Sequence, residues 1–377
     1  MMNRDKPEYE HGRVTKIGIL ICNLGTPEAP NAKAVRRFLA EFLSDVRVVE
    51  LPRTLWLPIL HGIVLRLRPR RSAAAYAKVW REDGSPLMAI SKRQGAAIGR
   101  AMEVQLSGRT EVVVAMRYGQ PSIASGLRKL RDSNARKILI LPLYPQYSGS
   151  TTGSVFDAVS AELGRWRWVP TLRFINDYYA NAQYIEALAN SVRSFWAAQG
   201  RGEHLLMSFH GTPKASLLAG DPYHCQCQTT ARLLAERLQL GDTDWDICFQ
   251  SRFGWNEWLQ PYTTDRLRQL GDKGVTRVDV VSPGFSADCL ETLEEIELQY
   301  AEMFSQAGGG SLRYIPALND SDEHIEALVA LIRRNLAGWD EAESTWDAAL
   351  DEQQRNAGSL RADSIKNRLP GNTESAT

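Results

Sequence analysis

Short apolar runs alternate with longer amphipathic segments along most of the chain. Several runs, such as residues 137–143, are apolar at nearly every position, which is typical of parallel strands buried on both faces. Because runs and amphipathic segments alternate, we expect parallel sheets with helices on both faces. The pattern predicts strands at residues 17–23, 111–116, 137–143, 169–174, 204–209, 246–250 and 277–282. It predicts helices at residues 31–42, 91–104, 122–132, 178–199, 228–238, 263–271 and 289–306.

The alternation of strands and helices runs twice along the chain. Residues 17–27 and 205–213 are both predicted strands that end in Gly-Thr-Pro. This internal similarity predicts an α/β fold of two doubly wound parallel-sheet (Rossmann-like) domains with an active-site cleft between them. We expect an N-terminal domain over residues 15–185 and a C-terminal domain over residues 186–337.

The last part of the chain differs in character from the rest. Residues 338–377 are rich in Asp, Glu, Ser, Asn and Arg and carry no strand pattern. We expect one short helix around residues 341–354, followed by a solvated, disordered tail with no catalytic role.

The composition is that of a globular protein. The 377 residues include 45 basic and 44 acidic side chains, which leave a formal net charge of +1 and give no reason to expect a nucleic acid partner. The five cysteines are an odd number and form no CxxC pair, which favours a reduced, cytoplasmic setting.

One apolar segment points to the membrane surface. The stretch from Leu51 to Leu65 is apolar and is followed by basic residues between positions 66 and 71, which suits peripheral membrane contact or capture of an apolar ligand. A buried helix with a solvated basic end explains this pattern equally well. No run is long enough to span a bilayer, and the N-terminal residues lack the apolar core of a signal peptide. We expect a cytoplasmic protein, with a peripheral position at the inner membrane face as an open alternative.

Two segments place titratable groups just past predicted strands. His210 precedes a Gly-Thr-Pro turn that would hold its ring outward, although a lone histidine there is often only a hydrogen-bonded structural residue. Glu291 and Glu295 lie four residues apart in a predicted helix, so they would share a helix face. Asp288 near the helix start is explained as well by capping. An imidazole facing carboxylates suits chemistry that moves protons together with a divalent metal such as Fe²⁺.

Other strand ends could line a site for a large flat ligand. Arg117 and Tyr118 end one strand with a guanidinium group and a phenol, and residues 249–259 are dense in aromatic rings. Guanidinium groups pair with carboxylates, and aromatic faces stack on flat rings. Ordinary packing is the simpler explanation for Trp258 taken alone. Residues 142–154 lack the lysine of a phosphate-binding loop, so we expect them to line a ligand or cap a helix.

Taken together, these segments resemble the ferrochelatase family, whose members insert ferrous iron into protoporphyrin IX. The resemblance spans about residues 15 to 335, and the combination of motifs is more specific than any one of them. It is carried by Asn-Leu-Gly-Thr-Pro at 23–27, Gly-Ser-Pro at 84–86, Arg-Tyr-Gly at 117–119, Tyr-Pro-Gln-Tyr-Ser at 144–148, Ser-Phe-His-Gly at 208–211 and the acidic segment 283–295.

The resemblance implies the reaction and the residues that perform it. His210 matches the family's active-site histidine, a metal ligand and proton acceptor; Glu291 matches its carboxylate partner, and Glu295 continues the acidic row. The implied partners are protoporphyrin IX and Fe²⁺, both as substrates. The stretch from Leu51 to Leu65 resembles the apolar lip at the family's pocket mouth, which can touch the membrane. The implied porphyrin-binding residues are Leu24, Ser85, Arg117, Tyr118 and Trp258.

Three positions depart from parts of the family. Animal relatives bind an iron–sulfur cluster through a cysteine at the position of Gly149 and three more in a C-terminal extension; here the tail has no cysteine, so we expect no tightly bound cofactor and no cluster. Some relatives have a second histidine where this chain has Cys289, and a carboxylate where it has Gln299.

Several alternative functions stay open at this point. A sibling chelatase that uses coproporphyrin, or one that inserts cobalt, would share the pocket residues. A porphyrin or haem carrier would bind without catalysis, but it gives no reason for a row of carboxylates. A metallohydrolase would need histidines at ligand spacing, and the six histidines form no HxH or HExxH pattern.

Overall fold

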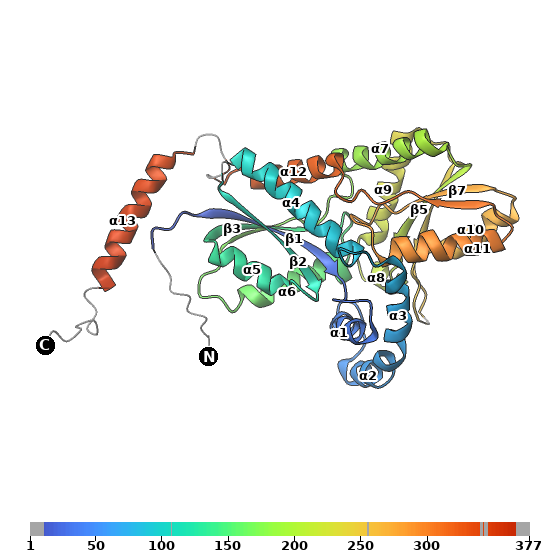
Figure 1. Ribbon diagram of the computed structural model, residues 1–377, viewed down its shortest axis with the longest axis horizontal. Helices are drawn as coiled ribbons and strands as arrows, with labels where there is room; N and C mark the ends of the chain where they lie inside the picture. Colours follow the sequence, from blue (N-terminus) through green and yellow to red (C-terminus); the bar gives the residue numbers. More distant parts are fainter. Residues whose placement is uncertain (1–10, 107, 255, 340–341, 343–345, 367–377) are drawn as a thin grey trace.

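Two four-stranded parallel sheets form the body of the molecule. The computed structural model describes residues 11–106, 108–254, 256–339, 342 and 346–366 (Figure 1). The first sheet has the order β2-β1-β3-β4, and the second has the equivalent order β6-β5-β7-β8. All neighbouring strands in both sheets are parallel, which confirms the predicted doubly repeated α/β fold. The strands are β1 (Lys16–Gly25), β2 (Thr110–Tyr118), β3 (Ala135–Pro142), β4 (Thr171–Phe174), β5 (His204–His210), β6 (Trp245–Gln250), β7 (Arg277–Val281) and β8 (Ser311–Tyr314).

The first sheet is buried on both faces, as its continuous apolar strands predict. Ile17, Ile19 and Ile21 of β1 point into a core that contains residues of α4 (Pro86–Leu106) and α12 (Asp322–Leu336). Leu20 and Cys22 point to the opposite face and pack with residues of α5 (Ile123–Asp132) and α6 (Ser154–Leu163). This alternation follows from the two-residue repeat of a strand.

The second sheet is covered in the same way. Leu205, Met207 and Phe209 of β5 pack with residues of α9 (Tyr223–Leu238) and α7 (Ala182–Gln199). Leu206 lies on the other face, among residues of α10 (Thr263–Asp272), η3 (Glu291–Tyr300) and α11 (Ala301–Gln306), where η marks a π-helix. Ser208 and His210 continue that second face toward the end of β5, because side chains two apart in a strand share a face.

One apolar core joins the two sheets. Ile19 of the first sheet and Met207 of the second belong to the same buried cluster, together with residues of α7 and α12. Helix α12 follows the second sheet in sequence but contacts α4 and β3 of the first. The first sheet lies within the predicted residues 15–185 and the second within 186–337, whereas α7 spans the predicted boundary.

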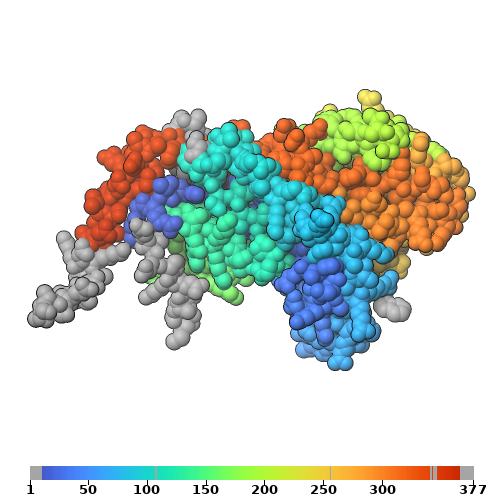
Figure 2. Space-filling model, viewed as in Figure 1, coloured from blue at the N-terminus to red at the C-terminus, as the bar shows by residue number. Residues whose placement is uncertain are grey.

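A helical lobe projects from the first sheet beside the carboxyl end of β1. It consists of α1 (Ala32–Leu43), α2 (Arg53–Ile59), η1 (Leu60–Val64) and α3 (Leu65–Val79), and Figure 2 shows it as the blue protrusion below the body. We call the segment from Leu51 to Val79 the lip. Trp56 and Leu60 hold the lip to α1 and Tyr118, while Leu55, Ile63 and Leu67 are exposed.

Some expected elements differ from the structure. Strand β8 was not predicted, because its four residues are half exposed and show no apolar run. Residues 291–300 form a π-helix rather than the expected α-helix. The expected helix at 341–354 falls partly outside the described residues; the helix observed there is α13 (Ala348–Lys366), so residues 355–366 are helical where we expected disorder. Two short helical segments, η2 (Gly149–Gly153) and α8 (Lys214–Leu218), follow β3 and β5 respectively.

Candidate active site

His210 ends β5 with a fixed ring. Its Nδ1 lies 2.6 Å from the backbone oxygen of Gly211. An oxygen of this kind only accepts, so Nδ1 carries a proton, and Nε2 is the ring nitrogen left to act as a base or a ligand. Trp258 lies behind the ring, with the two ring centroids 6.4 Å apart and tilted by 46°. The histidine is therefore oriented as a base or metal ligand through Nε2.

Glu291 is the first residue of η3. Its side chain lies near Cys289, which precedes η3, and near the lip helix α3. Burial, and then the charge of Glu291, hold the pKa of the Cys289 thiol well above its usual range. The same two causes raise the pKa of Tyr76 on α3. Burial lowers the pKa of Arg68, also on α3, and the charge of Glu291 opposes that shift. The Glu291 side chain therefore lies close to Cys289 and to Tyr76 and Arg68 of the lip helix α3.

The Glu295 carboxylate accepts several hydrogen bonds that the sequence did not predict. Its Oε1 accepts hydrogen bonds from the Ser251 amide at 2.9 Å and from the Tyr300 hydroxyl at 2.6 Å. Its Oε2 accepts from Ser251 Oγ and from Gln250 Nε2, the latter at 3.3 Å. Four donors therefore fix this carboxylate against the loop that follows β6.

The π-helix changes which side chains meet along the acidic row. Side chains five residues apart are hydrogen-bonded: Glu295 with Tyr300, and Glu294 with Gln299 at 2.6 Å. A π-helix closes its backbone hydrogen bonds over five residues instead of four, which brings these pairs together. That Glu291 and Glu295 share a helix face stays a prediction. Glu294 is buried and also forms an ion pair with Lys78 of α3 at 2.9 Å.

Asp288 has a structural role. It is 3% exposed, and its carboxylate accepts from Tyr314 OH at 2.7 Å, Asn319 Nδ2 at 2.7 Å and Thr292 Oγ1 at 3.2 Å. These bonds join the end of β8 to the start of η3. Of the two explanations that the sequence allowed, a cap-like structural role agrees with these contacts.

Arg117 and Tyr118 converge on a buried carboxylate at the end of β2. The Arg117 guanidinium lies 2.6 Å from Asp45 Oδ2, and the Tyr118 hydroxyl donates to the same oxygen at 2.8 Å. Ser154 Oγ also donates to Asp45. Burial would raise the pKa of Asp45, but the hydrogen bonds and the charge of Arg117 lower it on balance. Tyr118 is fully buried in this arrangement.

Leu24 and Ser85 lie where the two sheets approach each other. Leu24 ends β1 and packs against a small apolar cluster that includes Leu87 and Cys289. Ser85, just before α4, accepts a hydrogen bond from Thr26 Oγ1 at 2.8 Å. Since Cys289 immediately precedes the helix of Glu291, residues from both sheets meet at the carboxyl ends of their strands.

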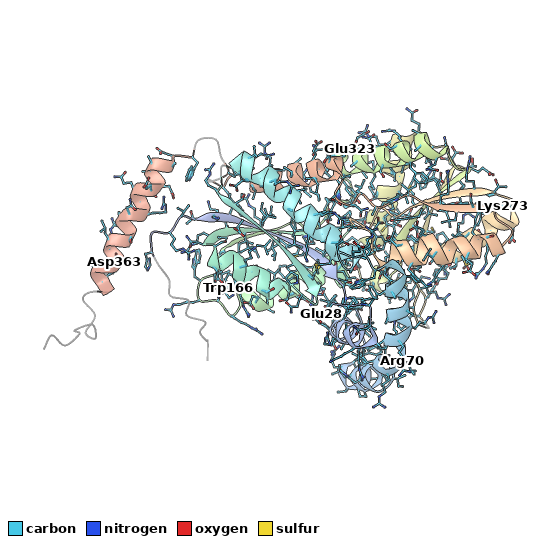
Figure 3. All side chains as sticks on the ribbon, viewed as in Figure 1. Glu28, Arg70, Trp166, Lys273, Glu323 and Asp363 are labelled. Carbon is cyan, nitrogen blue, oxygen red and sulfur yellow. The ribbon has the colours of Figure 1, made fainter. Side chains whose placement is uncertain are left out.

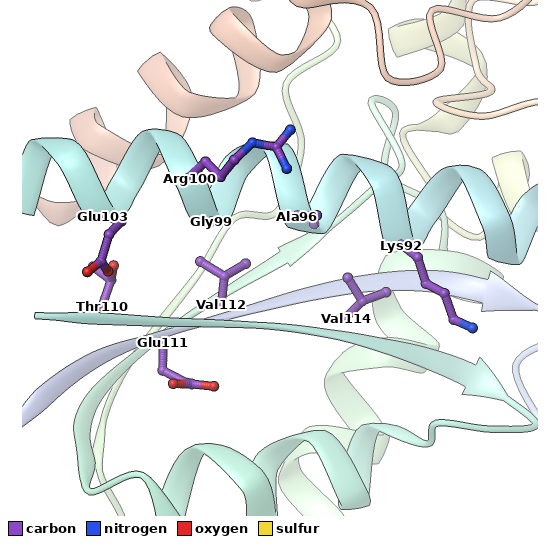
Figure 4. Close-up of a pocket in the computed structure, with 10 residues that line it drawn as sticks. Lys92, Ala96, Gly99, Arg100, Glu103, Thr110, Glu111, Val112 and Val114 are labelled. Atoms are coloured by element: carbon purple, nitrogen blue, oxygen red, sulfur yellow. The ribbon is translucent and has the colours of Figure 1, made fainter. Parts of the chain in front are cut away.

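The structure contains no ready-made metal cage in its described residues. Nowhere in them do three or more His, Cys, Asp or Glu side chains gather closely enough to hold an ion. A pocket of about 350 Å³ lies elsewhere, between α4 and the edge strand β2, with Lys92, Arg100 and Glu111 on its walls (Figure 4). It runs along the first half of β2, so we do not include it in the candidate site.

Known proteins agree with these observations. The sequence model of the family described as Ferrochelatase matches residues 16–336. The chain belongs to the ferrochelatase family. It is 56% identical to the ferrochelatase of Thioalkalivibrio sulfidiphilus, over 94% of this chain and 96% of that one. It is 55% identical to the ferrochelatase of Nitrosococcus oceani, over 92% and 96% of the two chains. The chain is therefore a metal chelatase of the lyase class, with a porphyrin and a metal ion as substrates.

A solved structure shares the fold at low sequence identity. SirB from Bacillus subtilis, solved with Fe³⁺, aligns with a TM-score of 0.52 and 12% identity, over 88% of this chain and 99% of that chain. This likeness supports the ferrochelatase chain's arrangement of two similar parallel sheets and nothing further.

Sequence reasoning missed several residues that shape this site. Gln250, Ser251 and Tyr300 hold Glu295, and Asp45 holds Arg117 and Tyr118. Gln250 could have been predicted to bind other site residues, because it is a polar residue at the end of an apolar strand and a buried amide needs hydrogen-bond partners. Asp45 lies outside any strand end, so no pattern in the sequence singled it out.

Proposed function

We propose that this chain inserts Fe²⁺ into protoporphyrin IX to give protohaem, at the carboxyl ends of β1, β2, β5 and β6. Two pyrrole protons leave as the ferrous ion enters, and iron keeps its oxidation state. The observation that carries the proposal is the fixed imidazole of His210, held with Nδ1 toward Gly211, at the same end of the second sheet as Glu291, whose backbone is hydrogen-bonded to the strand neighbour of His210.

The residues have distinct roles in this proposal. His210 accepts pyrrole protons through Nε2, and Glu291 receives the incoming ion, because an oxygen ligand binds Fe²⁺ weakly enough to release it. Glu295 completes the acidic row, while its four hydrogen bonds make it the less available of the two carboxylates. The proposed porphyrin contacts are Leu24, Ser85, Arg117, Tyr118 and Trp258.

Anaerobic insertion of Fe²⁺ into protoporphyrin IX tests the proposal. We expect turnover by the wild type and a loss of about 10²–10⁴-fold in kcat for His210→Ala, the range of a general base, with porphyrin binding retained. Glu291→Gln should also lose turnover, whereas Glu297→Gln, an exposed carboxylate on the same helix, should not. Near-normal turnover by His210→Ala would contradict the assignment.

The choice of substrate has its own readout. Parallel assays with coproporphyrin III and with Co²⁺ should give lower kcat/KM than protoporphyrin IX with Fe²⁺. Faster turnover of either would assign the chain to the corresponding sibling activity, and tight porphyrin binding without any insertion would identify a carrier.

We also propose that the protein holds no iron–sulfur cluster. Cluster ligands are thiolates, and burial raises the pKa of the Cys248 thiol to about 12 and those of Cys22 and Cys289 above their usual range. At Gly149 the backbone amide donates to Asp221 at 2.7 Å. Iron and sulfide analysis of anaerobically purified protein should give no stoichiometric content; a visible cluster spectrum would overturn this proposal.

The lip is our proposed site of peripheral membrane contact. None of the helices in the described part of the chain is both long and apolar enough to cross a bilayer. Leu55, Ile63 and Leu67 on the lip are 56%, 55% and 73% exposed. Arg70 extends from α3 at the outer end of the lip (Figure 3). Exposed apolar side chains beside basic ones bind anionic lipid surfaces.

Flotation with lipid vesicles tests this contact. Vesicles containing phosphatidylglycerol should retain the wild type, and a Leu55→Asp/Leu67→Asp variant should lose this retention. Leu218→Asp is the matched control, since Leu218 is 78% exposed on α8 of the second sheet. Equal retention of both variants would contradict a role for the lip.

A further inference from the structure

The buried side chain of Gln250 links the strand that carries His210 to the helix that carries Glu291. Gln250 lies opposite His210 in the parallel pairing of β5 and β6, and it is 1% exposed. Its Oε1 accepts from Ser208 Oγ at 2.8 Å. Its Nε2 donates to the backbone oxygen of Glu291 at 2.9 Å and to Glu295 Oε2 at 3.3 Å.

Only an amide satisfies all of these partners. Ser208 offers a hydrogen, whereas the Glu291 carbonyl and the Glu295 carboxylate need hydrogens, and an amide supplies one acceptor and two donors. A glutamate at this position would place an oxygen atom against the Glu291 carbonyl and the Glu295 carboxylate. An apolar residue would remove all three hydrogen bonds. The Gly211 amide also donates to the Gln250 backbone oxygen at 2.8 Å, which ties the turn after His210 to the same residue.

We propose that Gln250 is a positioning residue for metal insertion: it sets the separation between the His210 ring and the Glu291 carboxylate. The proposal rests on the proposed function of those two groups. The ring is fixed to β5 and its turn, and the carboxylate is fixed to the first turn of η3. Gln250 is bonded to both, so its removal lets the helix move relative to the base.

Two substitutions remove these bonds without changing size greatly. Gln250→Met keeps the length and loses every polar contact, and Gln250→Glu keeps the shape and loses both donors. We expect kcat for Fe²⁺ insertion to fall about 10–100-fold in each, the usual cost of losing a group that orients a metal-site residue. Porphyrin binding, followed by fluorescence quenching, should not change.

A matched control separates positioning from a general loss of stability. Gln94 is also fully buried, and its Nε2 donates to the carbonyl oxygens of Ser286 and Asn319 at 2.9 and 2.8 Å. Gln94→Met and Gln250→Met should both lower the melting temperature. Only Gln250→Met should lower kcat and speed the hydrogen exchange of the amides in residues 291–300. Unchanged exchange in Gln250→Met would overturn the anchoring of η3.

The decisive measurement is a double-mutant cycle with Glu291. If Gln250 acts through the position of Glu291, then Gln250→Met should cost little further activity in a Glu291→Gln background, because residues that act as a unit are not additive. Full additivity would overturn the proposal. An inactive wild type would instead overturn the proposed function, while an active wild type with normal kcat in Gln250→Met would overturn only the role of Gln250.

Discussion

Replacing Glu295 should mainly weaken the fold, because this carboxylate holds the loop after β6. Glu295→Ala leaves the Ser251 amide and the Tyr300 hydroxyl without their acceptor. Each unsatisfied donor costs about 1–3 kcal/mol, so the variant should lose about 2–6 kcal/mol of unfolding free energy. Glu295→Gln keeps one acceptor oxygen but loses the charge, and we expect a loss of about 1–2 kcal/mol, since charge-assisted bonds are about twice as strong as neutral ones.

These free energies convert into measurable shifts in melting temperature. An unfolding entropy of about 2.1 cal/mol/K per residue gives about 0.8 kcal/mol/K for 377 residues. Glu295→Ala should therefore melt about 3–8 °C below the wild type, and Glu295→Gln about 1–3 °C below it. Differential scanning calorimetry at neutral pH measures both.

The control is Glu297→Ala, which removes an exposed carboxylate from the same helix and should change stability by less than about 0.5 kcal/mol. The alternative, that Glu295 is a metal ligand, is tested by measuring the KM for metal insertion with Zn²⁺, which does not oxidise in air. If Glu295→Gln has the melting temperature of the wild type but a KM for Zn²⁺ at least tenfold higher, Glu295 is a direct metal ligand. The prediction that it mainly stabilises the fold would then be wrong.

Three further predictions concern the rest of the fold. Asp45→Asn leaves the Arg117 guanidinium without its carboxylate and should cost about 3 kcal/mol in urea unfolding. Burial lowers the pKa of His324 to about 4 from the ordinary 6.5, so the unfolded chain binds more protons between these values. The unfolding free energy should be at its full value above pH 6.5 and fall by up to about 3 kcal/mol toward pH 4. In His324→Asn, the unfolding free energy measured with urea should depend less steeply on pH over this range. Gly95→Ala should cost about 1–3 kcal/mol, because its Cβ would lie 2.2 Å from Val114 Cγ2, and an added Val114→Ala should restore part of this.

Each of these predictions has a clear contrary result. Asp45→Asn as stable as the wild type would mean that Arg117 finds another partner. An unchanged pH slope in His324→Asn would assign the acid sensitivity to other groups. Gly99→Ala is the control for Gly95, since its Cβ would lie 3.8 Å from Val112 Cβ and should stabilise α4 by up to about 1 kcal/mol. If both glycine substitutions change the unfolding free energy equally, α4 must shift to make room for the added methyl group at either position.

The sequence predicted the parts of the fold that rest on long apolar patterns. Residues 17–23 lie wholly within β1, and the repeated Gly-Thr-Pro ends marked β1 and β5, the first strand of each sheet in sequence and an inner strand in both. Strand β8 escaped prediction because only four half-exposed residues form it. The order of strands in each sheet did not follow from the pattern, since helices of similar length connect neighbouring and non-neighbouring strands alike.

The site was predictable in its residue types but not in its contacts. His210 and Glu291 stood out because titratable groups follow apolar strands there, and the family resemblance added their roles. The π-helix at Glu291–Tyr300 could not be foreseen, because an acidic amphipathic segment reads the same at α- and π-helical spacing. The partners of Glu295, such as Ser251, come from a distant loop, so only the three-dimensional packing brings them together.

The position of α12 has a consequence for synthesis of the chain. This helix is made after both sheets, yet its side chains pack into the core on one face of the first sheet. Strand β4, the last strand of that sheet, precedes α12 by about 150 residues. At about 5–20 residues per second, the ribosome needs about 7–30 s to cover that interval. During this time α4 covers its share of this face, but the apolar part that α12 will cover stays exposed, so the first half of the chain is more prone to aggregate before α12 is made than after.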